Sequence, residues 1–294
     1  MSVSRIRFTR VLWLTLAVPL FLLSPLAIPH APFPQQDAPL TKEQLDARDA
    51  INQGVAAFKN AQFDEAERLF QRAKQLDPSL QNATLYLATT YASQYIPGAP
   101  SEENIQRGKL AAQEYREVLG RDPTNLSAID GLASILYQMA GQPFSPELFT
   151  ESKTFHQKHI ELKPQDPQPY YSVGVIDWAL AYRANTQLRA EFNKSVGGQG
   201  LKDMDPLPEF LRSEYAREYG PTVDEGIDHL HRAIALKPDY DDAMVYLNLL
   251  YRRKADMVAS PAERDRLTDQ ANDLLDKVRD IKQSRARNTP RGSN

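Results

Sequence analysis

The chain has 294 residues, a formal net charge of -3, 41% hydrophobic residues and no cysteine. The absence of cysteine excludes a disulfide scaffold, a thiol nucleophile, a zinc site of the cysteine type and a lipid-carrying cysteine. The slightly acidic balance argues against a nucleic-acid partner, which needs a basic footprint on the protein. The length alone allows one or two domains.

The first 31 residues are a separate unit. Three arginines within the first ten residues precede an apolar stretch at 11–28, and no acidic residue occurs before Asp37. This pattern predicts an export segment, either a cleaved signal peptide or a retained membrane anchor, and the arginines mark its cytoplasmic side. We therefore expect the rest of the chain in the periplasm, after an extended, proline-rich linker at 32–40.

Helical patterns begin at Thr41, which has Gln44 three places on, an arrangement typical of a capping box. Four of the following helices are predicted to end in similar four-residue segments, each with proline at its last position. In front of the first ending lies a helix, a turn and a second helix. The four endings are Gln75-Leu76-Asp77-Pro78, Gly120-Arg121-Asp122-Pro123, Glu161-Leu162-Lys163-Pro164 and Ala235-Leu236-Lys237-Pro238.

This pattern, with Ala66 and Phe70 on the second helix, resembles the 34-residue tetratricopeptide repeat. Small residues such as Gly54, Gly174 and Gly226 stand where paired helices are expected to cross. The resemblance implies an all-α fold: a right-handed superhelix of about five helix-turn-helix repeats, with a capping helix at its end. The expected repeats are 47–80, 81–125, 126–166, 167–240 and 241–284, followed by a disordered tail at 285–294.

The four prolines are 45, 41 and 74 residues apart, so a 34-residue period leaves three insertions. The longest insertion is predicted at 183–220, with a glycine-rich centre near Gly198 and a short helix that ends at Tyr219. Loops of that length are usually functional or disordered.

No catalytic constellation stands out in the sequence, and we expect no enzyme activity and no cofactor. His156 and His159 have a spacing that could hold a metal on a helix, but no third ligand is evident. In the repeat frame both histidines occupy packing positions, so we predict packing in preference to metal binding.

In the tetratricopeptide family the first helix of each repeat lines a concave groove, and the resemblance therefore nominates residues on these helices. Aromatic residues with arginine nearby are typical of binding hot spots, although the same aromatic rings could simply pack between helices. The candidates for the groove are Arg48, Phe58, Asn82, Tyr137, Tyr171, Trp178 and Arg252. On the fifth first helix the repeat frame also places Val245 inward.

The sequence thus predicts a non-enzymatic scaffold that binds a peptide or helix of a partner protein, with membrane contact only through the N-terminal segment. Self-association through the last helix is a further possibility. The alternative is a small-ligand binder or enzyme whose site is completed by the insertion at 183–220. It depends on charged residues of that segment, namely Arg189, Glu191, Asp203, Asp205 and Glu209.

Three further stretches, 97–98 with 101–104, 170–178 and 239–254, look like those of exported repeat proteins from soil bacteria such as acidobacteria. That resemblance implies an exported bacterial protein and carries no assigned activity.

Overall fold

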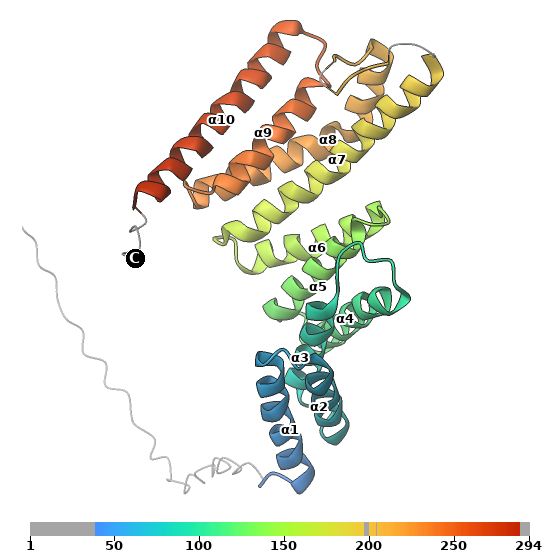
Figure 1. Ribbon diagram of the computed structural model, residues 1–294. Coiled ribbons are helices and arrows are strands. Elements are labelled where there is room, and N and C mark those ends of the chain that lie inside the picture. The colour runs from blue at the N-terminus through green and yellow to red at the C-terminus, as the bar shows by residue number, and fades with distance from the viewer. Residues whose placement is uncertain (1–38, 197–199, 204, 289–294) are drawn as a thin grey trace, which may run out of the picture. The chain divides into compact units, whose positions relative to one another are not determined.

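The computed structural model describes residues 39–196, 200–203 and 205–288, so the predicted leader lies outside the described residues. The described part is entirely helical (Figure 1) and contains no helix long and apolar enough to cross a membrane. Its ten helices are α1 (Lys42–Lys59), α2 (Phe63–Leu76), α3 (Gln81–Gln94), α4 (Glu102–Arg121), α5 (Leu126–Ala140), α6 (Pro146–Leu162), α7 (Pro167–Val196), α8 (Glu209–Leu236), α9 (Asp241–Ala255) and α10 (Pro261–Asn288).

Several helices begin at a polar cap, as the sequence predicted for the first of them. The Gln44 backbone N–H donates to Thr41 Oγ1 at 3.3 Å, and the Thr41 N–H donates back to Gln44 Oε1 at 3.0 Å. Ser101 and Ser145 cap α4 and α6 through one such bond each, from a backbone N–H to the serine hydroxyl. These bonds satisfy N–H groups that have no partner inside the helix.

The four proline endings stop α2, α4, α6 and α8 two residues before each proline. Asp77, which precedes Pro78, has φ -140° and ψ 90°, while its N–H still donates to Ala73 O at 2.9 Å. A proline ring crowds the residue before it and disfavours the helical conformation there. The repeated proline-terminated segment therefore marks the end of the second helix in four helix pairs.

The glycines at the predicted crossings allow close contact between paired helices. A Cβ atom on Gly174 would lie 2.4 Å from Leu230 Cγ, and one on Gly54 would lie 2.6 Å from Phe70 Cε1. Both distances are too short for carbon atoms, so a larger side chain would force the helices apart. The predicted role of these glycines is confirmed.

The structure differs from the sequence-based expectation at the long insertion. Residues 183–196 continue α7, and residues 209–220 form the beginning of α8, which runs on through Pro221 to Leu236. The predicted short helix ending at Tyr219 is therefore wrong. The extra residues lengthen both helices into one hairpin, held by apolar side chains such as Leu211 and Tyr215.

Arg189 fixes the end of this hairpin. Its guanidinium is only 4% exposed and donates to the carbonyl oxygens of Lys202 and Asp205 at 2.8 and 2.9 Å. It also donates to Asp256 Oδ1, after α9, at 3.1 Å. The sequence analysis named Arg189 as a candidate for a small-ligand site. In the structure its guanidinium instead binds the loop between α7 and α8.

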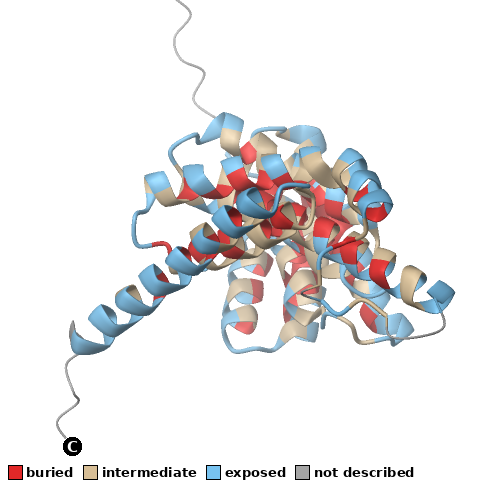
Figure 2. Ribbon diagram, turned by 90° about the horizontal axis from the view of Figure 1, so that it is seen from above, coloured by how far each residue is buried: buried red, intermediate tan, exposed pale blue. Residues whose placement is uncertain are grey.

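The buried side chains form two principal clusters, one shared by α1 to α5 and one by α7 to α10. Buried and exposed positions alternate along the helices (Figure 2). Among the first helices, α3 contacts both α1 and α5, and α7 contacts α9. Contacts between α5 and α7 are few. A small cluster around Phe149 and Ile176 joins the two parts. The array therefore consists of two helical stacks that meet at α6 and α7.

The last helix packs against α9 with the buried side chains of Leu267, Ala271 and Leu274, as expected for a capping helix. The prediction of a disordered tail from residue 285 is wrong at its start, because α10 continues to Asn288. Arg285 donates to Asp241 Oδ1 at 2.8 Å and so ties the helix to the start of α9.

Candidate functional site

A cavity of about 410 Å³ lies where the two stacks meet, and we call it the tyrosine cavity. It is open to solvent and receives side chains from the first helices α5, α7 and α9, with α6 and the turn after it closing one side. Its lining residues are Asp130, Ser134, Tyr137, His156, His159, Asp166, Gln168, Pro169, Tyr171, Ser172, Val175 and Tyr246.

Three half-buried tyrosines, one from each first helix, form the aromatic part of the wall: Tyr137, Tyr171 and Tyr246. The rings of Tyr171 and Tyr246 meet edge to face at 5.7 Å between centroids. Burial and the neighbouring Tyr246 raise the pKa of Tyr137 and of Tyr171, so both phenols keep their protons at neutral pH. None of the three hydroxyls has a hydrogen-bond partner among the residues that the structure describes, which leaves them available to a ligand.

The polar side of the cavity is organised around His159. Its Nδ1 lies 2.6 Å from Asp130 Oδ1, and its Nε2 lies 3.4 Å from Asp166 Oδ2. The neighbouring His156 has no hydrogen-bond partner in the described part of the chain. Burial, together with the charge of His159, lowers the pKa of His156 to about 4, so this imidazole is neutral at neutral pH.

His159 is largely buried, as predicted, and also contacts two carboxylates, while His156 lines the cavity. Sequence reasoning did not foresee Asp166, because it lies in the turn between helices and not on a first helix. It also missed Tyr246: the repeat frame had placed the neighbouring Val245 inward on the fifth first helix. An aromatic residue one position from an expected groove position was the available signal.

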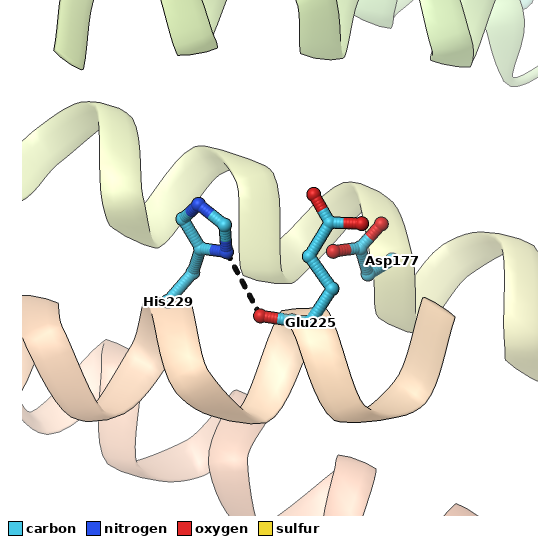
Figure 3. A group of neighbouring side chains, drawn as sticks. All are labelled: Asp177, Glu225 and His229. Carbon is cyan, nitrogen blue, oxygen red and sulfur yellow. Dashed lines mark hydrogen bonds between the residues drawn. The ribbon is translucent and has the colours of Figure 1, made fainter. Parts of the chain in front are cut away.

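A second group of polar residues, Asp177, Glu225 and His229, places its possible ligand atoms within 4.8 Å of one another (Figure 3). The Lys153 ammonium already lies between the two carboxylates and donates to Asp177 Oδ1 and Glu225 Oε2, both at 2.7 Å. The His229 Nδ1 faces the carbonyl oxygen of Glu225 at 2.8 Å. The Lys153 ammonium thus occupies the place beside the two carboxylates that a metal ion would take. We interpret the group as a structural clamp joining α6, α7 and α8.

The electrostatics of this clamp are those of a buried ion pair. Asp177 is fully buried, and burial raises the pKa of its carboxyl to about 7 despite the attraction of Lys153. Burial alone would lower the pKa of the Lys153 ammonium. The interactions with Asp177 and Glu225 outweigh this effect, so the pKa is raised. The clamp spans the junction beside the tyrosine cavity.

The structure brings together three of the seven predicted groove residues. Tyr137 and Tyr171 line the tyrosine cavity, and Trp178 lies beside it with its ring 5.2 Å from that of Tyr246. Arg252 instead donates to Asn272 Oδ1 of α10 at 2.8 Å, so its guanidinium faces the last helix. Arg48 and Asn82 are exposed on α1 and α3.

Phe58, the remaining predicted residue, lines a second cavity of about 540 Å³ between α1, α2 and α3. This cavity is mainly apolar, with Val55, Leu85 and Tyr86 in its wall. None of the described residues of the insertion at 183–220 lines either cavity. A ligand site completed by that segment therefore has no support at these two places.

The paired helices, their proline-marked ends and the cavities along the first helices define the tetratricopeptide-type fold, an all-helical solenoid. Comparison with solved structures agrees. The protein MamA matches with a TM-score of 0.54 and 15% identity over 85% of this chain and 98% of the other. YrrB, described as a TPR protein with an unusual peptide-binding site, matches with a TM-score of 0.50 and 15% identity over 83% and 94%.

Among curated proteins, the chain is similar to the type IV pilus assembly protein PilF of Pseudomonas aeruginosa, at 23% identity over 156 residues. The match covers 53% of this chain, and the chain spans about half, 55%, of the relative. No protein-family model matches the chain. These comparisons show a shared fold over most of the chain.

Proposed function

We propose that this protein is a non-enzymatic interaction module of the bacterial cell envelope, which binds a peptide segment of a partner protein along its first helices. The tyrosine cavity is the principal contact. The observation that carries the proposal is that three tyrosine side chains, whose hydroxyls have no hydrogen-bond partner in the described part of the chain, line one open cavity where the two helical stacks meet. Buried aromatic side chains with a polar tip are typical anchors of protein interfaces.

Two likenesses support this function. The solved structure of YrrB is described as having a peptide-binding site, and its fold covers most of the present chain. The likeness to a protein named for type IV pilus assembly, together with the predicted export segment at 1–31, supports a place in the cell envelope. Self-association through α10 stays a prediction that no observation favours.

The proposal predicts that the double variant Tyr171→Ala and Tyr246→Ala loses peptide binding. Removing two interface anchors should weaken the affinity at least about tenfold, since hot-spot side chains contribute about 2 kcal/mol or more each. The measurement is retention of random nine-residue peptides on the immobilised protein, followed by titration of the retained peptides.

The matched control is Tyr251→Ala, which removes a tyrosine of the same helix α9. Tyr251 is half-buried and its hydroxyl lies 2.8 Å from His231 Nε2 of α8, outside the tyrosine cavity. This variant should keep the wild-type affinity. Equal binding by wild type and double variant, or no retained peptide at all, would contradict the proposed function.

A further inference from the structure

We infer that the tyrosine cavity takes a positively charged side chain, lysine or arginine, of the bound peptide. The inference rests on the proposed function and adds the chemistry of the anchor residue. It comes from the charges and aromatic surfaces that line the cavity.

The charged lining is acidic. Asp130 and Asp166 both face the cavity, with side chains 49% and 40% exposed, and no lysine or arginine is among its described lining residues. The Asp130 Oδ1 atom contacts His159, whereas its Oδ2 has no hydrogen-bond partner in the described part of the chain. The Asp166 Oδ1 atom accepts from the Gln168 N–H at 2.9 Å and its Oδ2 lies near His159, so Asp130 Oδ2 is the carboxylate oxygen of the pair that is left for a cation.

A third carboxylate, that of Asp242 at the start of α9, adds to this negative field. It is close enough to Tyr171 and Tyr246 to raise the pKa of both phenols, in each case after burial as the larger cause. A field that resists ionisation of a phenol attracts an ammonium or guanidinium group by the same electrostatics.

The rest of the lining suits a long cationic side chain. Tyrosine rings pack against the methylene groups of lysine or arginine, and they attract the charged end when it lies over a ring face. His156 is neutral, because its pKa lies near 4, so it does not repel a cation and can accept a hydrogen bond. An acidic side chain would instead face the carboxylates of Asp130 and Asp166, which disfavours acidic peptides.

The test is a positional-scanning library of nine-residue peptides, in which one position at a time is fixed to lysine, arginine, norleucine, glutamine or glutamate. Wild-type protein should retain pools with lysine or arginine at one position at least about tenfold better than pools with norleucine, the uncharged isostere. Retention of these pools should fall when salt is raised from 0.05 to 0.5 M, because salt screens exposed charges.

The double variant Asp130→Asn and Asp166→Asn keeps the size of both side chains and should lose the preference for a cation while it still binds peptides. Asp273→Asn on α10, an exposed aspartate outside the cavity, is the control and should keep the preference. Thermal unfolding of each variant checks that the fold is intact.

Peptide binding with a norleucine or glutamate preference, or a lysine preference that survives the double substitution, would overturn the inference and leave the proposed function standing. Failure of the wild type to bind any pool would overturn both. The two failures are therefore distinguishable.

Discussion

Replacing Gly174 with valine should lower the free energy of unfolding by about 2–3 kcal/mol, because overpacking of a filled core carries a cost of this order. A Cβ atom at this position would lie 2.4 Å from Leu230 Cγ and 2.7 Å from its Cδ2. Leu230 is fully buried. The longest hairpin of the array, α7 with α8, would have to separate at its crossing point.

Urea denaturation of the purified chain measures this loss, and Gly120→Ala is the matched control. Gly120 is exposed at the end of α4, and a Cβ atom there would meet nothing within 4 Å. Alanine should therefore leave stability unchanged or raise it by up to about 0.5 kcal/mol, through its better helix propensity. Wild-type stability of Gly174→Val would show that these two helices do not cross at this glycine.

Replacing Lys153 with methionine should cost about 3 kcal/mol at pH 8, since removal of one partner leaves a buried charge without compensation. Lys153 is 14% exposed and bridges the fully buried Asp177 and the half-exposed Glu225. Without the ammonium, Asp177 must either hold an unpaired charge at the junction of the two stacks or take up a proton.

The loss should be smaller at pH 5 than at pH 8. The pKa of Asp177 in the folded chain is about 7, above its ordinary value of 3.8. Between about pH 4 and pH 7 the Asp177 carboxyl therefore holds a proton in the folded state that it has released in the unfolded state. The contribution of Asp177 to the free energy of unfolding falls as the pH rises through that range. Removing Lys153 raises the folded-state pKa further, so the penalty grows most at high pH.

The matched control for Lys153→Met is Lys254→Met. Lys254 forms a surface ion pair with Asp224 at 2.6 Å, with side chains 35% and 58% exposed. Such pairs contribute about 0–1 kcal/mol, so this substitution should have a small effect at either pH. Equal losses for both variants in chemical denaturation at pH 5 and pH 8 would contradict the role of the clamp.

The local features of the fold were predictable from the sequence. The proline endings, the capping box at Thr41 and the crossing glycines each depend on neighbouring residues or on one close helix contact. The insertion at 183–220 was misjudged because a fixed 34-residue period assumes helices of constant length. In the structure the additional residues continue α7 and α8, where their apolar side chains face each other.

The site was predictable only in part. Tyr137 and Tyr171 followed from the position of the first helices, but Tyr246 required the true rotation of α9, which the repeat frame missed by one residue. The clamp of Lys153 joins residues 24 and 72 positions away, and such contacts leave no local pattern in the sequence. The acidic character of the cavity likewise appears only when Asp130 and Asp166 meet at His159.

The central claim, that the first helices hold a partner at the tyrosine cavity, is tested most directly by site-specific photocrosslinking in the living cell. A photoreactive phenylalanine replaces Ser134 inside the cavity or, as control, Thr154, an exposed residue of α6 that does not line it. The account predicts that the probe at 134 joins one defined partner segment that carries a lysine or arginine next to the crosslink, while the probe at 154 does not. Crosslinks of equal yield from both positions, or none from position 134, would contradict it.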